Sequence, residues 1–328
     1  MHTPLSIKNV SGRLPCPWHP SVVYVAEGWS GHKYWMAQTP YPPFNIEPYR
    51  DYYELPCIHY SDDGIHWNTI PNNPIEELTK EEIDAHNYYS DPHLVLRDGK
   101  LDLYYRFTYL KDKQLIDNKT VLLKRTSSDG FRWSEREIVA DLRKPEDVAI
   151  WGEQIISQAI VWNNGICRCY YVDRSSYLSK RKILCTTSVN GKEWQPYLEV
   201  ELMGRELDPW HIDVQYYDGK FQMIVYDMDR LVWFDSEDGL CFHFVSEILG
   251  PSPNRYDFYS DGLYRACSVK TADGIFVYFS ARRKKNTYIG LLHSYDRHIF
   301  KPINGISLMK WVPTVWKPLL KSLWKRNS

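Results

Sequence analysis

The chain has 328 residues, of which 40 are Lys or Arg and 41 are Asp or Glu, so its formal net charge is −1. This balance gives no reason to expect a nucleic-acid partner, which a strongly basic protein would attract. No apolar run reaches the length of a transmembrane helix, and the first residues lack the apolar segment of a signal peptide. We therefore expect the body of the protein to be cytoplasmic.

The cysteine and aromatic content narrows the class further. The seven cysteines are an odd number without zinc-site spacing, which favours free buried thiols in a reducing compartment. Aromatic residues make up 15% of the chain, with 13 Trp and 25 Tyr. Such side chains pack well between strands, and they also cover the apolar face of a sugar ring, so both interpretations stay open.

A phrase of two short strands joined by a tight turn occurs five times along the chain. Asp-Gly or Asn-Gly pairs at the turns of four copies are the signal of a hairpin. The copies begin at His19, Asp91, Ser157, His211 and Leu263. Repeats of roughly 40–70 residues built only from strands indicate a radial array of small sheets. The sequence therefore predicts an all-β fold, a five-bladed β-propeller.

A second phrase, Ser-x-Asp/Asn-Gly-x-x-Trp/Phe, is interleaved with the first and begins at Ser61, Ser127, Ser188 and Ser236. Its Ser and Asp or Asn side chains can bond to the turn backbone, while its Gly supplies a positive φ. It resembles a shortened form of the Asp-box turn of propellers, and we interpret it as structural. The best helix candidate outside the C-terminal tail is short and falls within residues 72–90.

The first residues of the five inner strands are polar, although the strands that follow are apolar. Because inner strands of a propeller run in one sense, these residues should meet at one end of a central channel. They are His19, Asp91, Ser157 with Gln158, His211 with Asp213, and Tyr264 with Arg265. Desolvating polar groups without partners costs free energy. Either they bond to one another and to trapped water, or they form a sugar-binding site, which we favour.

The inner strands and the Ser-Asp-Pro at residues 90–92 resemble the five-bladed propellers of the glycoside hydrolase family 43 and 32 superfamily. The resemblance covers nearly the whole chain. It implies three acids, an Asp on each of the first two inner strands and a Glu on the third, acting on an oxocarbenium-like state. Asp91 matches the second acid. His19 stands where the first belongs, and Gln158 or Ser157 stands near the third.

Other carboxylates are candidates to replace the two unmatched acids. Glu54 should open the third strand of the first unit, and Asp213 should share a strand face with His211. Glu153 and Asp257 precede the third and fifth inner strands. Two arginines, Arg106 and Arg265, could hold a carboxylate or phosphate, or could form structural ion pairs.

These observations predict a carbohydrate-active enzyme, and we favour a membrane-peripheral glycosyltransferase that modifies a surface polysaccharide. The alternatives are a family 43/32-type glycoside hydrolase with relocated acids and a non-catalytic glycan-binding propeller. The expected catalytic residues are Asp91, Glu54, Asp213 and His211. The expected substrate-binding residues are His19, Gln158, Arg265, Tyr264, Trp210 and Arg106. The histidines show no metal-binding spacing, so we predict no metal ligand, and the sequence requires no cofactor beyond an activated sugar donor for a transferase.

Residues 308–328 break the repeat and form a separate tail after a propeller domain at residues 1–307. The tail carries five basic and no acidic side chains, together with Trp and Leu. This composition is typical of a segment that lies on an anionic membrane surface. We predict a partly helical tail that places the protein on the inner face of the membrane. The alternative is a tail packed on the propeller with solvated lysines.

Overall fold

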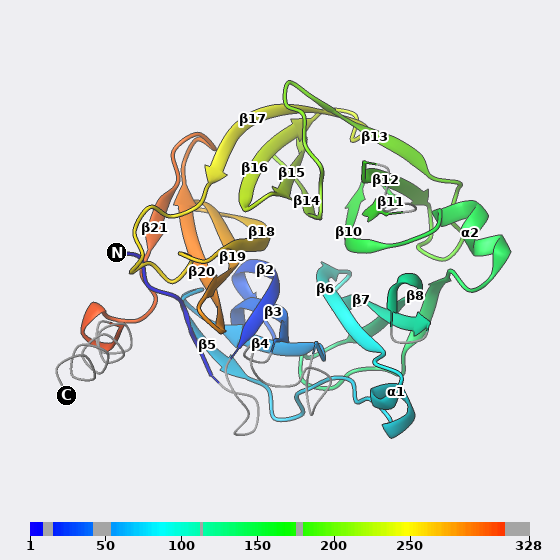
Figure 1. Cartoon of the computed structure of the whole chain (residues 1–328), viewed down its shortest axis with the longest axis horizontal. Coiled ribbons are helices and arrows are strands. Elements are labelled where there is room, and N and C mark those ends of the chain that lie inside the picture. Colours follow the sequence, from blue (N-terminus) through cyan, green and yellow to red (C-terminus); the bar gives the residue numbers. More distant parts are fainter. Residues whose placement is uncertain (9–15, 42–53, 112–113, 175–179, 312–328) are drawn as a thin grey trace, which may run out of the picture.

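The computed structural model describes residues 1–8, 16–41, 54–111, 114–174 and 180–311. They form up-and-down antiparallel meanders arranged around a common centre (Figure 1). Among the described residues, two short helices and one helical turn at residues 308–311 interrupt an otherwise β structure. The prediction of an all-β fold is confirmed.

The first sheet has five strands in the order β1-β5-β4-β3-β2. Their bounds are β1 (Ser6–Ile7), β2 (Pro17–Trp29), β3 (His32–Pro40), β4 (Cys57–Ser61) and β5 (His66–Thr69). β1 comes from the start of the chain and pairs in parallel with β5. The N-terminal residues therefore cover a strand edge that would otherwise be open to association.

Two further sheets are meanders of four strands in chain order. One contains β6 (Tyr88–Arg97), β7 (Lys100–Lys111), β8 (Gln114–Ser127) and β9 (Glu137–Asp141). The other contains β18 (Leu263–Thr271), β19 (Gly274–Arg283), β20 (Asn286–Ser294) and β21 (Lys301–Ile303).

The remaining sheet has eight strands and contains two meanders joined edge to edge. The first meander is β10 (Ile156–Asn163), β11 (Ile166–Asp173), β12 (Lys182–Ser188) and β13 (Leu198–Met203). The second is β14 (His211–Tyr217), β15 (Lys220–Asp227), β16 (Arg230–Ser236) and β17 (Cys241–Leu249). The join is a parallel pairing of β13 with β17. Because two meanders share one sheet, the number of blades stays a prediction.

The hydrophobic core lies mainly between neighbouring meanders. One cluster joins Trp35 and Ile58 of the first meander to Tyr89 and Tyr105 of the second. Another joins the first meander to the last, and so closes the ring visible in Figure 1. The aromatic residues that the sequence places on the strands thus act largely as packing between sheets.

The Ser-x-Asp-Gly phrases form the expected turns. In the first, the Ser61 hydroxyl accepts a hydrogen bond from the Gly64 N–H (3.0 Å), and Asp63 accepts from two following N–H groups. A fifth turn of this kind, which the sequence did not reveal, is built by Ser294 and Asp296. Its position for Gly is taken by Arg297, which adopts a φ of 66°.

Two helices connect strands on the outside of the ring. The helix expected within residues 72–90 is α1 (Lys80–Asp84), which begins with a capping box between Thr79 and Glu82. The second, α2 (Pro145–Trp151), was not predicted. It is anchored by Trp151, whose ring packs against Trp194 at a centroid distance of 4.9 Å.

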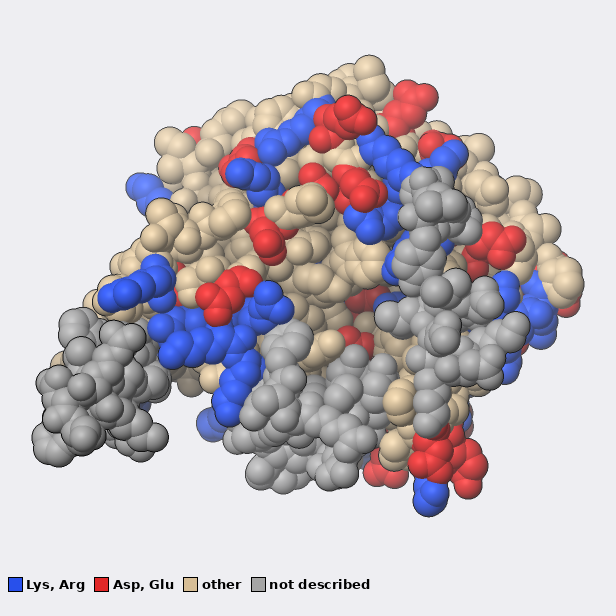
Figure 2. Space-filling view, in the orientation of Figure 1, with Lys and Arg blue, Asp and Glu red and all other residues tan. Residues whose placement is uncertain are grey.

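The tail begins with one helical turn whose Trp311 packs against Tyr288. Residues 312–328 lie outside the described part of the chain, so membrane attachment through this tail stays a prediction. Among the described residues, the helices are too short or too polar to cross a bilayer. On the face seen in Figure 2, basic and acidic side chains are interspersed, in keeping with the net charge of −1.

Candidate functional site

The five inner strands β2, β6, β10, β14 and β18 line the centre, and each contacts the next around the ring. Four of them carry a bulge at the same place, near His19, Asp91, Ser157 and Arg265. His19, Asp91 and Ser157 have positive φ values of 50°, 53° and 54°. Bulges of this kind re-aim a side chain, and here they direct polar groups toward the centre.

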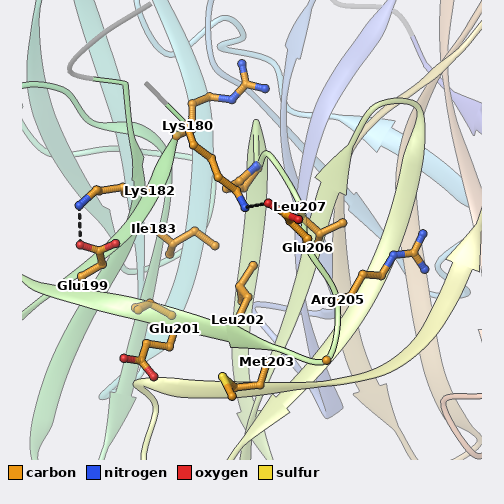
Figure 3. A pocket seen from close by; sticks show the side chains of 14 residues that line it. Lys180, Lys182, Ile183, Glu199, Glu201, Leu202, Met203, Arg205, Glu206 and Leu207 are labelled. Carbon is orange, nitrogen blue, oxygen red and sulfur yellow. Dashed lines mark hydrogen bonds and ion pairs between the residues drawn. The ribbon is translucent and has the colours of Figure 1, made fainter. Parts of the chain in front are cut away.

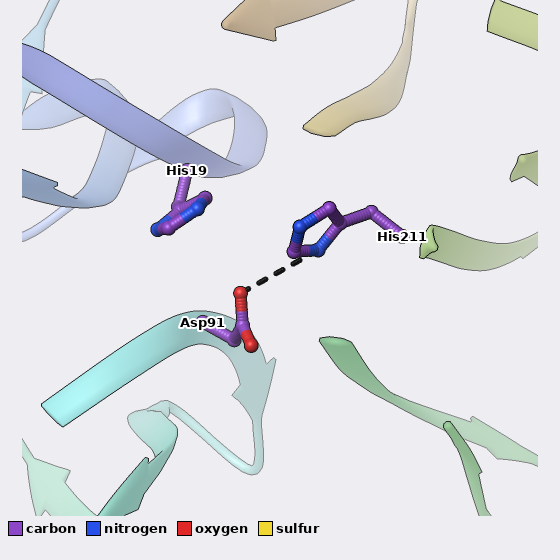
Figure 4. A group of neighbouring side chains, drawn as sticks. All are labelled: His19, Asp91 and His211. Carbon is purple, nitrogen blue, oxygen red and sulfur yellow. Dashed lines mark ion pairs between the residues drawn. The ribbon is translucent and has the colours of Figure 1, made fainter. Parts of the chain in front are cut away.

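His19, Asp91 and His211 meet at this centre (Figure 4). One ligand-type atom from each side chain lies within 4.8 Å of the others, and all three residues are buried. The dashed line in Figure 4 joins Nδ1 of His211 to Oδ1 of Asp91, and these two atoms are 3.6 Å apart. The structure thus brings together residues of the first, second and fourth inner strands, which we call the central trio.

The two carboxylate oxygens of Asp91 have different surroundings. Oδ2 accepts hydrogen bonds from Nε of Arg106 (2.6 Å) and from the backbone N–H of Ser157 (3.2 Å). Oδ1 has no hydrogen bond, although an Arg265 nitrogen lies 3.5 Å away. Burial acts to raise the pKa of Asp91, but Arg106, the two histidines and Arg265 together hold it below the usual range. Asp91 is therefore an anion with one oxygen left for another partner.

Both histidines of the trio have unused ring nitrogens. Nδ1 of His19 is bonded to the Thr39 hydroxyl (2.8 Å), which leaves Nε2 without a partner. Neither ring nitrogen of His211 has a hydrogen bond. Desolvation lowers the pKa of His19 to about 3 and the pKa of His211 well below its ordinary value. Both rings are neutral near pH 7 and offer lone pairs.

Glu54 completes the acidic groups of the site. It lies in a turn just ahead of β4 rather than on a strand, and it is buried with Oε1 4.0 Å from Nδ1 of His19. Burial, and then the charge of Asp91, raise the pKa of Glu54 to about 8. Its carboxyl group therefore carries a proton near neutral pH, and its Oε2 has no partner.

Arg265 and Gln158 both contact Asp91, Arg265 at the carboxylate and Gln158 at the backbone carbonyl. Arg265 is fully buried, and its NH2 group donates a long hydrogen bond (3.5 Å) to the Gln158 carbonyl. The Gln158 side chain in turn donates to the backbone carbonyl of Asp91. Gln158 has no acidic group. Its contacts instead help to hold Asp91 and Arg265 in position.

Tyr264 and Trp210 form an aromatic wall beside His211. Nε1 of Trp210 donates to the Tyr264 hydroxyl (2.6 Å). The Tyr264 ring stacks on Trp18 at 5.0 Å and meets the His211 ring edge-on at 4.3 Å. Both predicted binding residues therefore lie next to the trio.

Asp213 lies one step further along the channel than His211. It accepts a hydrogen bond from the Ser268 N–H (3.1 Å) and is 3.8 Å from Nδ1 of His93. Two other candidates are placed in structural contacts. Glu153 is an exposed partner of Lys119, and Asp257 binds the backbone N–H of His2 (2.7 Å).

The trio offers three donor atoms that could hold a metal ion. Two imidazole nitrogens and one carboxylate oxygen suit ions such as Zn²⁺ or Fe²⁺ and leave positions open for water and substrate. The expectation that the histidines include no metal ligand stays a prediction, although these three side chains could hold an ion. Sequence spacing could not reveal the set because its members come from three separate units.

Comparison with known proteins gives one curated relative and many solved structures. No family model matches the chain. The "A type blood N-acetyl-alpha-D-galactosamine deacetylase" of Flavonifractor plautii is 23% identical over 317 residues. The match covers 81% of this chain but 40% of that protein, so the chain spans about two fifths of the relative's length.

Similar structures share the fold over most of the chain. A crystal structure of an N-acetylgalactosamine deacetylase from F. plautii, in complex with blood group B trisaccharide, has a TM-score of 0.66 at 20% identity. It covers 88% of this chain and 92% of that one. A family 43 β-xylosidase/α-arabinofuranosidase from a compost metagenome, in complex with xylotriose, has a TM-score of 0.58 at 11% identity. It covers 94% and 100%. At these identities the likeness shows the fold alone, that of the family 43 propellers.

The prediction of glycosyl transfer is wrong. The similar proteins are hydrolytic carbohydrate enzymes, namely a deacetylase and family 43 glycoside hydrolases. Hydrolysis uses water in place of an activated sugar donor, so the predicted donor has no support. The alternative reading as a hydrolase fits these relatives better.

Proposed function

We propose that this protein is a five-bladed propeller that removes acetyl groups from N-acetylated carbohydrates with a divalent metal ion held by His19, Asp91 and His211. The observation that carries the proposal is the set of buried, unpartnered ligand atoms of the central trio. The similarity to N-acetylgalactosamine deacetylases supports the choice of the acetyl group as the target.

A metal ion accounts for polar atoms that would otherwise be buried without compensation. Buried polar groups are normally hydrogen-bonded, because leaving them bare costs about 1–3 kcal/mol each. Thr39 holds one nitrogen of His19, and Arg106 holds one oxygen of Asp91. These outer contacts fix the orientation of each side chain and leave a single atom of each to bind the ion.

The reaction breaks the C–N bond of the acetamido group by adding water to its carbonyl carbon, giving acetate and an amine. A divalent ion bound at the trio would polarise the carbonyl oxygen and acidify a bound water. Glu54, beside His19, carries a proton near neutral pH and would donate it to the departing nitrogen, while the proton lost by the acidified water passes to solvent. The wall of Trp210 and Tyr264 would orient the sugar ring.

Glycoside hydrolysis is the second candidate, and the opposed acidities of two carboxyl groups favour it. Glu54 is held protonated while Asp91 is held ionised, which is the division of labour of a glycosidase pair. Against it, Arg106 and Ser157 occupy Oδ2 of Asp91, and a histidine takes the place of the first acid.

The test measures two products from one substrate. Protein stripped with a chelator and reloaded with Zn²⁺, Mn²⁺ or Co²⁺ is incubated with p-nitrophenyl glycosides of N-acetylhexosamines. We expect acetate release that needs the metal and falls at least about 100-fold in His211→Ala. His59→Gln, which changes a buried histidine outside the site, should retain activity. Release of p-nitrophenol without acetate would contradict deacetylation and favour the glycosidase.

A further inference from the structure

A groove of about 620 Å³ lies between β12, β13 and the segment that leads into β14 (Figure 3). Its size falls within the range of ligand-binding sites. The apolar part of its wall consists of Ile183, Val200, Leu202, Met203, Leu207 and Pro209. We call it the inter-meander groove.

The groove exists because β13 changes partners along its length. Its first half pairs with β12, where Ile183 lies opposite Val200. From Glu201 onward it pairs instead with β17 of the next meander. β13 therefore departs from the start of β12 and leaves a hollow between two meanders.

The groove opens at the same end of the ring as the central trio. β10 and β12 run in the same direction, since each is antiparallel to β11. The start of β12, at Lys182, thus lies at the end where Ser157 begins the channel. Pro209 lines the groove and is two residues from His211.

Side-chain contacts connect the groove to the trio without a break. The Arg181 guanidinium lies 4.7 Å from the centre of the Trp210 ring. Trp210 donates to Tyr264, whose ring lies 4.3 Å from that of His211. The groove and the trio are therefore neighbours, separated by the rings of Trp210 and Tyr264.

The charges at the groove argue for an uncharged ligand. Lys180 pairs with Glu206 (3.1 Å) and Lys182 with Glu199 (2.6 Å), as Figure 3 shows. Arg181 pairs with Asp208 (2.6 Å). Because carboxylates already balance the charges of these basic groups, the groups would contribute little to the binding of an acidic sugar chain. Apolar walls with polar groups at the rim instead match the C–H faces and hydroxyls of a neutral sugar.

We propose that the inter-meander groove binds the sugar residues next to the one whose acyl group reaches the trio, so that the substrate is an uncharged oligosaccharide. This rests on the proposed function for the identity of the reacting sugar. The binding of the adjoining sugars needs no metal and can be measured separately.

The experiment uses Met203→Trp, which places a large ring at an exposed position of the groove on β13. The matched control is Ile138→Trp, at an exposed position of β9, the corresponding outer strand of another meander. Binding to the metal-free protein is measured by calorimetry and by NMR. The ligands are free N-acetylhexosamines, triacetylchitotriose, a neutral trisaccharide ending in N-acetylgalactosamine, and an acidic hyaluronan tetrasaccharide.

We expect a neutral trisaccharide to bind at least about tenfold tighter than its terminal monosaccharide. Met203→Trp should remove this gain without changing monosaccharide binding, and Ile138→Trp should change neither. Equal affinity for monosaccharide and trisaccharides, preference for the hyaluronan fragment, or no effect of Met203→Trp would overturn the proposal. If trisaccharides bind through the groove but no acetate is released on adding metal, the groove stands and the proposed function fails.

Discussion

At the scale of single residues, Asp91 stands at the meeting point of two arginines and two histidines. Its Oδ2 is saturated by Arg106 and the Ser157 N–H, while its Oδ1 faces the histidines. A carboxylate fixed in this way can bind a metal ion through one oxygen only. The arginines keep it ionised, which a metal ligand requires.

Asp91→Asn should lower metal affinity by about 100-fold or more, because it removes the only charged ligand of the trio. It also leaves Arg106 and Arg265 buried without their counter-charge, which should lower the free energy of unfolding by ~3–5 kcal/mol. Calorimetric metal titration and urea unfolding measure the two effects. Asp213→Asn is the control, since Asp213 lies outside the trio. Unchanged metal affinity in Asp91→Asn would rule out the trio as the site.

Glu54 should make the stability of the metal-free protein depend on pH. Its pKa is raised to about 8 in the folded chain from an ordinary value of 4.5, so the folded state holds its proton more tightly than the unfolded state. This contribution is complete below about pH 4.5 and is lost as pH rises through 8.

The pH dependence predicts a specific difference from Glu54→Gln. Between pH 5 and 8, the free energy of unfolding of the unsubstituted protein should fall relative to that of the variant by up to about 4 kcal/mol. Urea unfolding with chelator present, at a series of pH values, measures this. Parallel pH profiles for the two proteins would show that Glu54 is not buried in this way.

Some residues of the site could be predicted from the sequence. His19, Asp91 and His211 stood out because they begin apolar strands, and their convergence follows from the repeat. That they form a possible metal site could not be deduced, because it depends on distances between three strands. Nor could the pairing of Arg106 with Asp91, which requires the register of β6 against β7.

At the scale of elements, the turns explain both what the repeats revealed and what they hid. Four Ser-x-Asp-Gly turns were recognised because Gly marks the position with positive φ. The fifth escaped because Arg297 adopts that conformation without being Gly. The helix α2 was not predicted from the sequence because it is stabilised by the burial of Trp151. This tertiary contact cannot be deduced from the short sequence of the helix itself.

Gly99 and Gly130 have nearly the same backbone conformation but different surroundings. Substituting each of them therefore distinguishes the effect of backbone strain from the effect of packing. Gly99 (φ 71°) has nothing within 4 Å of an added Cβ, whereas a Cβ on Gly130 (φ 78°) would lie 2.3 Å from the Trp35 ring. Gly99→Ala should lower the free energy of unfolding by about 1 kcal/mol. Gly130→Ala should lower it by ~3 kcal/mol or more, because overpacking adds to the strain.

Thermal and urea unfolding of both glycine variants check this difference. Similar losses at the two positions would mean that the Ser-x-Asp-Gly turn does not pack on the neighbouring meander as Trp35 and Gly130 indicate.

At the scale of the whole molecule, the sequence predicted the all-β ring of repeats but not how its meanders join. The parallel pairing of β13 with β17 depends on two outer strands that carry no repeat signature. The same pairing produces the inter-meander groove, so that candidate site was also hidden from the sequence.

The basic tail remains a proposal at this scale. We expect the full chain to sediment with vesicles that contain anionic phosphatidylglycerol and not with neutral phosphatidylcholine vesicles, because the tail carries five positive charges and several Trp. Deleting residues 312–328 should abolish sedimentation while leaving metal binding unchanged. Retained sedimentation of the shortened protein would exclude the tail as the anchor.

The first residues of the sequence contact both the first and the last meander of the ring. Ser6 and Ile7 pair with β5 of the first meander, while the Leu5 N–H donates to Ile289 and the Thr3 N–H to Asn304 in the last. Residues 3–7 therefore bridge the first and last meanders, and the contact between Thr3 and Asn304 spans 301 residues of the sequence. Because contacts between residues far apart in the sequence form slowly, we expect this closure of the ring to be completed late in folding.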